Sequence, residues 1–286
     1  MDRCRDANVS RYPQDRMPAD FTGKAIMVTG AAAGIGRAAA LEFATRGGSV
    51  ALIDRNAEAG QDAAAEILRR GGVACFLHAD VSSRPDSERC VAVVRERFGG
   101  IDVLVNNAGI QRYGTAADTP DEIWDEVMDV NLRGPFLMSR AAIPAMIARG
   151  GGAIIMVGSV QSLGAVGNSA AYVTSKHAVL GLARSIAVDF ARDGIRCHCV
   201  CPAAIDTPML QFGISQAADP ARARETCENL HLFRRLGAPE EVAHVIGFLA
   251  GSDSSFMTGH PVLVDGGALT PIGGSSFLES GTGSRK

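Results

Sequence analysis

Residues 24–36, "KAIMVTGAAAGIG", decide the fold, because an apolar run ends there in a turn of closely spaced glycines. Gly30, Gly34 and Gly36 permit a tight turn, close approach of the backbone to a pyrophosphate, and close packing of the following helix. The start of that helix offers unpaired N–H groups to an anion. A strand before the motif and a helix after it favour a dinucleotide site at Gly30, Gly34, Ile35 and Gly36 over an ordinary strand-to-helix connection.

Short apolar runs recur along the chain after this motif. They read "SVALID", "GVACFLHAD", "IDVLVN", "GAIIMVG", "IRCHCVC" and "HPVLVDGG", and most are separated by segments of helical period. Continuous hydrophobicity is typical of strands that helices cover on both faces, as in a parallel sheet. We therefore expect one doubly wound α/β domain of about seven strands over residues 21–270. Residues 1–20 are predicted to be a disordered or loosely packed extension, and residues 271–286 a flexible tail.

The bulk composition limits the kinds of partner that the protein can have. The 286 residues carry a formal net charge of −3, and basic residues occur singly or in pairs such as Arg69-Arg70. A phosphate backbone would call for a basic stripe instead. The apolar runs are too short to span a bilayer, and residues 1–20 contain no hydrophobic signal region. We expect a soluble cytoplasmic protein that binds neither nucleic acid nor membrane.

The pattern of cysteines favours a role in core packing over disulfide formation or metal binding. Their number, seven, is odd, which argues against a disulfide framework. Cys197, Cys199 and Cys201 alternate with the period of a strand, so they either bind a metal or fill one face of a buried strand. No matching Cys/His set at ligand spacing accompanies them. We therefore expect no metal site.

Two aspartates end predicted strands where a dinucleotide would lie. Asp54 follows Gly36 by eighteen residues, where a carboxylate accepts hydrogen bonds from the adenosine ribose and repels a 2′-phosphate. The alternative role for Asp54 is to cap the next helix, although Arg55 and Asn56 offer other caps. Asp80 and Val81 close the third strand, where Asp80 either meets the adenine amine or serves as a turn residue.

The stretch "YVTSK" places Tyr172 and Lys176 four residues apart on a predicted helix. Side chains at this spacing share one helix face, with Cβ atoms roughly 5–6 Å apart. The pair is either a surface pair or an acid whose pKa has been adjusted. An unperturbed tyrosine has a pKa of about 10, so it is a poor base at neutral pH. A lysine ammonium beside it would favour the phenolate and make Tyr172 a proton-transfer group.

Five motifs in this order resemble the short-chain dehydrogenase/reductase family over residues 22–267. They are "TGAAAGIG", "NNAG" at 106–109, Asn131 in "DVNLRG", Ser159 in "VGSVQS", and "YVTSK". The resemblance implies a single Rossmann domain with a seven-stranded parallel sheet in the order 3-2-1-4-5-6-7, a helical substrate lid, and a homotetramer. It also implies a catalytic set of Asn131, Ser159, Tyr172 and Lys176.

The resemblance assigns roles to these residues. Tyr172 would be the general acid or base for a substrate hydroxyl, while Ser159 holds the substrate oxygen. Lys176 and the positive nicotinamide ring of the oxidised complex would together lower the pKa of Tyr172. Lys176 would also bind the nicotinamide ribose, and Asn131 would support a water that links Lys176 to solvent. Asn131 has the alternative of a buried side chain that satisfies a helix break. Asn107, Ala108 and Gly109, together with Tyr172 and Lys176, would contact the cofactor.

Two departures from the family pattern affect the cofactor prediction. His198 stands where the family usually has asparagine, and Ala203 replaces the glycine of the Pro-Gly stretch, so the loop avoids positive φ at 203 or is strained. Cofactor contacts from Pro202, Ile205 and Thr207 are still expected. Ala33 stands where many NADP-preferring members carry a basic residue, which agrees with Asp54 in predicting NAD over NADP.

The substrate is predicted from the least regular parts of the chain. The segments "SVQS" and "CPAAIDTPML" resemble those of sugar dehydrogenases, in particular the aldohexose dehydrogenases. Gln111 and Gln161 would present amides to a hydroxyl-rich ligand or else face solvent. Residues 206–236 are predicted to form the lid, with His231 as a candidate substrate contact.

We therefore expect an NAD-dependent oxidoreductase that transfers hydride between nicotinamide and a secondary or anomeric alcohol of a sugar or polyol-like small molecule. An alternative is a 3-oxoacyl-[carrier protein] reductase, or another reductase of ketones. That alternative favours NADPH, which Asp54 and Ala33 oppose. A third possibility is a non-catalytic scaffold that binds the cofactor. The Asn131, Ser159, Tyr172 and Lys176 set argues against it, because a mere binder does not need an acid paired with a lysine.

Overall fold

The computed structural model describes residues 20–271, and the expectations for the two tails lie outside these residues. Strands and helices alternate along the described chain. The strands are β1 (Ala25–Thr29), β2 (Ser49–Asp54), β3 (Val73–His78), β4 (Val103–Asn106), β5 (Gly152–Val157), β6 (Ile195–Pro202) and β7 (Pro261–Val264). The helices are α1 (Gly34–Thr45), α2 (Ala57–Arg69), α3 (Arg84–Phe98), α4 (Asp121–Met128), α5 (Gly134–Ala148), α6 (Ala170–Phe190), α7 (Pro208–Ser215), α8 (Pro220–Asn229) and α9 (Pro239–Ala250).

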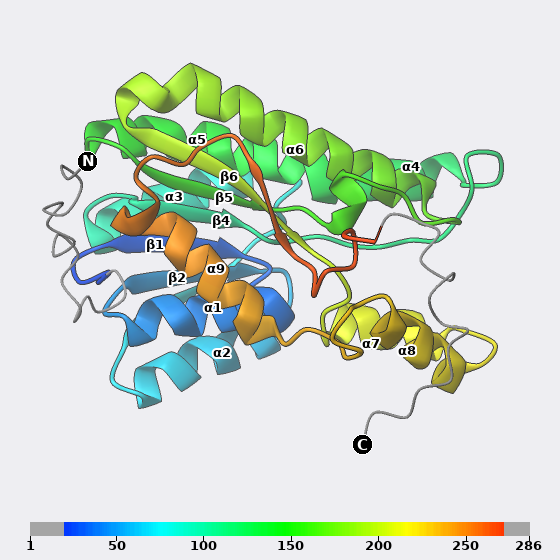
Figure 1. Ribbon diagram of the computed structural model, residues 1–286. Helices are drawn as coiled ribbons and strands as arrows, with labels where there is room; N and C mark the ends of the chain where they lie inside the picture. The colour runs from blue at the N-terminus through cyan, green and yellow to red at the C-terminus, as the bar shows by residue number, and fades with distance from the viewer. Residues whose placement is uncertain (1–19, 272–286) are drawn as a thin grey trace, which may run out of the picture.

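The strands form one parallel sheet in the order β3-β2-β1-β4-β5-β6-β7, which confirms the predicted topology. Helices α3 to α6 cover one face of the sheet, and α1, α2 and α9 cover the other (Figure 1). The order of the strands reverses between β1 and β4, and such a reversal opens a crevice at the carboxyl ends of the strands. Helices α7 and α8 stand beyond this end of the sheet (Figure 1).

Both faces of the sheet are buried, as the continuous hydrophobic runs indicated. Every residue of β1 and β4 is buried. Cys197, Cys199 and Cys201 lie in the apolar cluster on the α3–α6 side of β6, so they fill one face of the strand. Residues 20–271 contain no group of three side chains placed to hold a metal ion, and no helix among them has the length and apolar character needed to cross a membrane.

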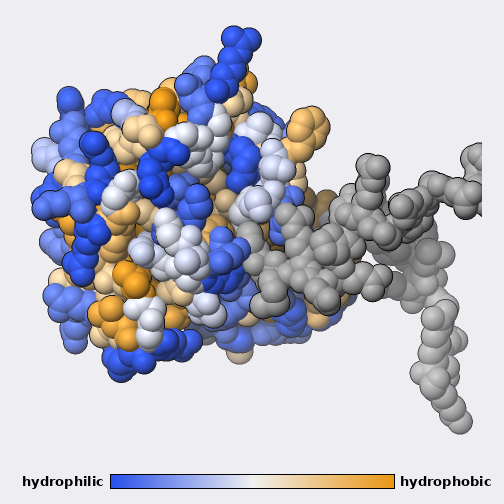
Figure 2. All heavy atoms as spheres, turned by 90° about the vertical axis from the view of Figure 1, so that its left-hand side faces the viewer, coloured by the Kyte–Doolittle hydropathy of each residue, from blue (hydrophilic) through white to orange (hydrophobic). Residues whose placement is uncertain are grey.

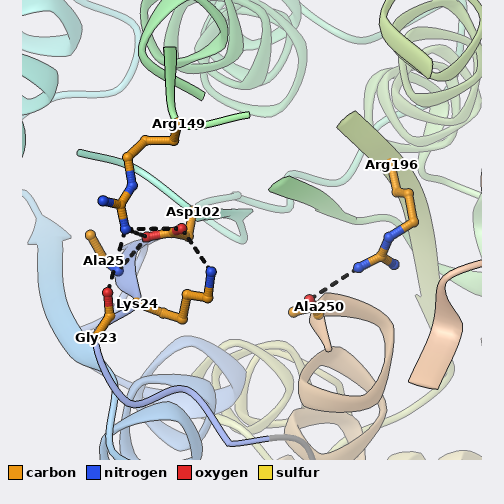
Figure 3. A network of polar contacts seen from close by, with 7 residues as sticks. All are labelled: Gly23, Lys24, Ala25, Asp102, Arg149, Arg196 and Ala250. Carbon is orange, nitrogen blue, oxygen red and sulfur yellow. Dashed lines mark hydrogen bonds and ion pairs between the residues drawn. The ribbon is translucent and has the colours of Figure 1, made fainter. Parts of the chain in front are cut away.

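A buried carboxylate joins three segments at the amino ends of the strands (Figure 3). Asp102 accepts hydrogen bonds from the Ala25 amide at 2.9 Å, from Lys24 Nζ at 3.2 Å and from Arg149 at 3.0 Å. Burial alone would raise the pKa of Asp102, but the Ala25 amide, Arg149 and Lys24 outweigh it and hold that pKa below its usual value of 3.8. The network fixes the starts of β1 and β4 to the end of α5.

A partly buried arginine performs a similar function at the other edge of the sheet (Figure 3). From β6, Arg196 donates to the carbonyl oxygens of Leu249, Ala250 and Gly251 and to the Ser254 hydroxyl, at 2.6–3.1 Å. These carbonyls end α9 and lack partners within the helix. The guanidinium therefore caps α9 and ties it to the sheet.

The end of the molecule opposite α7 and α8 is a mixed surface. Figure 2 shows hydrophilic residues with smaller apolar groups between them on the part of this face that is visible. The cleft described below lies at the other end of the strands.

Replacing Asp102 with Asn should lower the free energy of unfolding by about 3 kcal/mol at pH 7, because two cations lose a buried partner. The folded pKa of Asp102 is depressed, so its contribution is present above pH 3.8 and is lost as the pH falls through the folded value. The difference between wild type and variant in urea unfolding should therefore shrink in strong acid. Asp62→Asn is the control, since Asp62 makes an exposed ion pair with Arg37 that should contribute less than about 1 kcal/mol. Equal losses in the two variants would show that the buried network around Asp102 adds no more than a surface pair.

Candidate active site

A cleft of about 730 Å³ lies at the carboxyl ends of the strands. It gathers most of the residues that the sequence predicts for a site: Gly30, Gly34, Ile35, Asp54, Asp80, Val81, Asn107, Ala108, Gly109, Gln111, Ser159, Gln161, Tyr172, Lys176, Pro202, Ile205 and Thr207. Gly36 and Asn131 lie behind the wall and support it. His231 does not line the cleft.

The glycine turn fits the phosphates of a dinucleotide. Gly30 and Gly34 have φ of +63° and +53°, a conformation that favours glycine. Any Cβ at Gly36 would overlap the Gly30 carbonyl oxygen. The first residues of α1 include no acidic side chain, and Ala33 provides no side-chain cap, so the helix N–H groups remain available to an anion.

Asp54 lies in the cleft wall and closes the turn from the far side. Its carboxylate accepts hydrogen bonds from the Ala32 amide at 3.0 Å and from the Asn56 amide at 2.9 Å. The cap of α2 is Asn56, whose side chain accepts from the Ala59 amide, so Asp54 is not needed for that purpose. A carboxylate has room for further donors, and the cleft is where ribose hydroxyls would supply them.

Part of the hydrogen-bonding capacity of the Asp80 carboxylate is used within its own turn. It accepts hydrogen bonds from both the amide and the hydroxyl of Ser82, at 2.9 and 2.7 Å. Val81 is buried and lies against Gly134, where any Cβ would come within 2.8 Å of a Val81 methyl group. The pair thus shapes the edge of the cleft between β3 and α5.

The "NNAG" stretch is locked to the glycine turn. Asn107 donates from its side chain to the carbonyl oxygens of Thr29 and Gly30, both at 3.0 Å. The Thr29 hydroxyl accepts from the amides of Asn107 and Ala108, at 3.0 and 3.1 Å. These bonds hold the ends of β1 and β4 together at the point where the strand order reverses.

Asn131 lies in a short π-helical turn, Asp129–Arg133, between α4 and α5. Its side chain is buried and is bonded twice to Ile110, to the amide at 2.8 Å and to the carbonyl at 2.9 Å. It also donates to the Ser175 hydroxyl at 3.1 Å. Because Ser175 precedes Lys176 on α6, Asn131 connects α6 to the "NNAG" loop. Asn131 thus lies buried in an irregular helical turn, but its side chain bonds the Ile110 backbone and Ser175 and not the backbone of the turn.

Tyr172, Ser159 and Lys176 meet in a buried cluster. Lys176 Nζ lies 5.5 Å from the centre of the Tyr172 ring and donates to the Val157 carbonyl at 2.8 Å. Burial raises the pKa of Tyr172 to about 12, against a hydrogen bond with Ser159 that lowers it. Burial also lowers the pKa of Lys176 to about 8. The expected lowering of the Tyr172 pKa by Lys176 concerns the complex with the oxidised cofactor. In the protein alone burial dominates and raises that pKa, so the phenol is protonated at neutral pH.

Ser159 is supported by Ser162, which the sequence did not single out, and by the backbone of Gln161. The Ser159 amide donates to the Ser162 hydroxyl at 3.2 Å, and the Ser159 hydroxyl accepts from the Gln161 amide at 3.1 Å. Cys201 lies behind Ser162, and its thiol is within hydrogen-bond reach of the Ser162 side chain. The serine therefore sits in a short 3₁₀ turn that packs on the thiols of β6.

The loop after β6 adapts to its departures from the family pattern. Within residues 20–271 the non-glycine positions with positive φ are Asn168 and Arg234, so Ala203 avoids the strained region. His198 is fully buried beside Arg196, at 3.3 Å. Burial, Arg196 and His260 lower the pKa of His198 to about 4, which makes it neutral at pH 7. Thr207 caps α7 and lies next to Gly34.

At the substrate end of the cleft, Tyr113 is present although the sequence did not reveal it, and His231 is absent although the sequence suggested it. Tyr113, four residues after Gly109, lines the cleft together with Gln111 and Gln161. His231 is instead buried, with its ring against Gly266. The Leu232 amide donates to the Gly266 carbonyl at 2.9 Å, and this contact turns the end of the lid inward.

Comparison with known proteins agrees with this geometry. A family model described as "Enoyl-(Acyl carrier protein) reductase" matches residues 30–269. The chain is 41% identical to a 2-(R)-hydroxypropyl-CoM dehydrogenase of Xanthobacter autotrophicus, over 86% of this chain and 98% of that protein. It is 37% identical to a cyclohexanol dehydrogenase of an Acinetobacter species, over 86% and 95%.

Among solved structures, a short-chain type dehydrogenase/reductase from Mycobacterium marinum superposes with a TM-score of 0.83 at 34% identity, over 88% of this chain and 98% of that one. The family model covers strands β2 to β7, Gly30, Gly34 and Gly36 of the glycine turn, and the Ser159, Tyr172 and Lys176 cluster. The chain belongs to the short-chain dehydrogenase/reductase family, whose members are oxidoreductases that use nicotinamide cofactors.

Proposed function

We propose that this protein interconverts a small, mainly apolar secondary alcohol and its ketone, with NAD preferred over NADP. The observation that carries the proposal is the buried cluster of Ser159, Tyr172 and Lys176 in the wall of a cleft that also contains the glycine turn. A proton donor, an oxygen-binding hydroxyl and a dinucleotide cradle are the parts that hydride transfer to a carbonyl requires.

The residues divide the reaction between them. A bound nicotinamide would supply the acceptor or donor of hydride. Tyr172 is protonated at neutral pH, so in reduction its phenol donates a proton to the substrate oxygen, and in oxidation it takes that proton back. The Ser159 hydroxyl, held by its 3₁₀ turn, stabilises charge on the same oxygen. The Lys176 ammonium, fixed by Val157, stabilises the phenolate after proton transfer.

The walls of the substrate end favour an apolar ligand over a sugar. They include Ile110, Val160, Val166, Met209, Leu210 and Leu230. A small apolar pocket binds a ring or a short alkyl group well and leaves most sugar hydroxyls without partners. The names of the relatives, hydroxypropyl-CoM and cyclohexanol dehydrogenase, point to secondary alcohols of this kind.

A polyol-like substrate stays a second candidate because of Gln161. The side-chain oxygen Oε1 of Gln161 is buried and has no hydrogen-bond partner within residues 20–271, although the residue lines the cleft. A hydroxyl or second polar group of the substrate would satisfy this acceptor. One polar group beside the reacting alcohol fits the cleft better than the several hydroxyls of an aldose.

The preference for NAD rests on Asp54. A second negative charge, from a 2′-phosphate, would face this carboxylate at short range. Arg55 also lines the cleft and is the only cation next to Asp54 in sequence. We propose that the carboxylate dominates because the Ala32 and Asn56 amides fix it toward the turn.

The expected homotetramer is supported by exposed apolar residues on the α4–α6 layer. Trp124, Phe136 and Val188 lie on α4, α5 and α6 and are exposed. Apolar residues exposed on one layer are typical of an interface between subunits.

The proposed reaction is tested by following NADH at 340 nm with a panel of substrates. The panel holds cyclohexanol, 2-butanol, aldoses, polyols and 3-hydroxyacyl thioesters, each with NAD and with NADP. We expect the highest kcat/KM with NAD and a cyclic or branched secondary alcohol. Turnover confined to aldoses would restore the sugar hypothesis, and turnover confined to thioesters with NADP would select the carrier-protein alternative.

Tyr172→Phe should lower kcat by about 10³-fold or more, because the ring stays but the transferred proton is lost. The dissociation constant for NAD, measured by calorimetry, should stay within about threefold of wild type. Substantial turnover by the variant would rule out the assigned role of Tyr172.

The buried lysine predicts an alkaline limb in the pH profile of ketone reduction. The pKa of Lys176 is about 8 in the protein alone, so its positive charge is present below that pH and is lost above it. The value of kcat/KM, which reports groups of the free enzyme, should fall as the pH rises through this range. Lys176→Arg keeps the charge and should move the limb upward, provided that the variant still binds NAD. A limb that does not move would assign it to another group.

Asp54→Ala should erode the ratio of kcat/KM for NAD to that for NADP by about tenfold or more, because the repulsive charge is removed. Asp54→Asn removes the charge but keeps the size of the side chain and one oxygen acceptor for the turn, so it distinguishes the effect of the charge from that of the shape. If both variants keep the wild-type ratio, the preference lies elsewhere.

A further inference from the structure

A smaller cavity of about 190 Å³ adjoins the cleft at its substrate end. Five residues line both spaces, namely Gly109, Ile110, Gln111, Tyr113 and Met209. The remaining wall of the side cavity is Arg112, Phe212 and Gly213. Arg112 is paired with Glu126 at 2.8 Å and is bonded to the Gln111 carbonyl, so it brings no free charge to the space.

Tyr113 is the largest of the side chains that line both spaces. Its phenol is close enough to Tyr172 to contribute to the raised pKa of Tyr172. The side chain is half-exposed, at 50%. Tyr113 therefore lies in the wall between the two cavities and is not part of the hydrophobic core.

The backbone beside Tyr113 is fixed to the catalytic helix. The Gly114 amide donates to the Asn168 carbonyl at 3.1 Å, and the Ala170 amide donates to the Gly114 carbonyl at 3.0 Å. Ala170 begins α6, which carries Tyr172 two residues later. The backbone that carries Tyr113 is therefore anchored next to the start of the helix that carries Tyr172.

The tip of the ring is held by the lid. A Cβ at Gly213, inside α7, would overlap the Tyr113 hydroxyl oxygen but would lie 3.6 Å from the ring carbon Cζ, an ordinary contact. The Tyr113 hydroxyl therefore occupies the space that a side chain at position 213 would fill. The contact links the wall of the cleft to α7.

We propose that Tyr113 is a specificity-determining residue that closes the side cavity to the substrate and so limits the size of the group on the alcohol carbon. The side cavity is mostly apolar, with Ile110, Met209 and Phe212 in its wall, and suits an alkyl or aryl substituent. The inference rests on the proposed function, because it concerns the substituent of the secondary alcohol that would lie beside Tyr113.

The first test compares 2-butanol with 4-phenyl-2-butanol, in which one of the groups on the alcohol carbon is enlarged by a phenyl ring. In Tyr113→Ala the two cavities join, so the ratio of kcat/KM for the larger alcohol to that for the smaller should rise by about tenfold or more. Tyr113→Phe keeps the ring and should stay nearer the wild-type ratio. Phe233→Ala is the control, since Phe233 is an exposed aromatic residue outside both cavities and should not change the ratio. An unchanged ratio in Tyr113→Ala would overturn the proposal.

The second test measures the contact without turnover. Alanine normally stabilises a helix interior by up to about 1 kcal/mol relative to glycine, so Gly213→Ala should raise the melting temperature when Tyr113 is replaced by Phe. In the wild-type background the same change should lower it, because the methyl group meets the hydroxyl. The same shift in both backgrounds would show that the hydroxyl does not occupy that space.

The two tests separate the possible failures. If the wild-type protein turns over no alcohol, the proposed function fails, while the melting experiment still reports on the contact between Tyr113 and Gly213. If alcohols are turned over but Tyr113→Ala does not favour the larger one, the size limit fails and the proposed function stands.

Discussion

The close approach of three backbone segments at Gly30, Gly36 and Asn107 is the constraint on which the rest of the structure depends. Only glycine fits at position 36 against the Gly30 carbonyl, and the Asn107 amide bonds both Thr29 and Gly30. This contact joins the ends of β1 and β4, where the strand order reverses. Because the crevice opens at that reversal, every residue of the cleft is positioned relative to these few atoms.

The reaction centre depends on polar groups that are buried but well supported. Asn131 bonds the Ile110 backbone and Ser175, Lys176 bonds Val157, and Ser159 bonds Gln161 and Ser162. Burying a polar group without such partners costs about 1–3 kcal/mol. The partners offset that cost, and burial in turn produces the shifted pKa values of Tyr172 and Lys176. The same low-dielectric surroundings therefore explain both the rigidity of the site and its chemistry.

The sequence was informative where a local pattern determines geometry. Apolar runs predicted the strands, and the spacing of Tyr172 and Lys176 predicted that they share one face of α6. It was least informative in loops, because the direction of a loop side chain depends on contacts with distant segments. His231 was expected at the substrate but turns toward Gly266, and Tyr113 was overlooked although it lies in the wall. The spacing of Tyr172 and Lys176 revealed a neighbouring charge, but it did not reveal the burial that raises the pKa of Tyr172 in the protein alone.

Arg196 shows how the fold accommodates a charge for which residues 20–271 provide no carboxylate hydrogen-bond partner. Its guanidinium bonds the carbonyl oxygens at the end of α9 and the Ser254 hydroxyl, and no carboxylate is among these partners. The negative end of a helix dipole takes the place of an acidic residue. Dissolved salt screens exposed ion pairs far more than buried contacts of this kind. The edge of the sheet that carries β6, β7 and α9 is therefore held by an attachment that should keep its strength across a wide range of ionic strength.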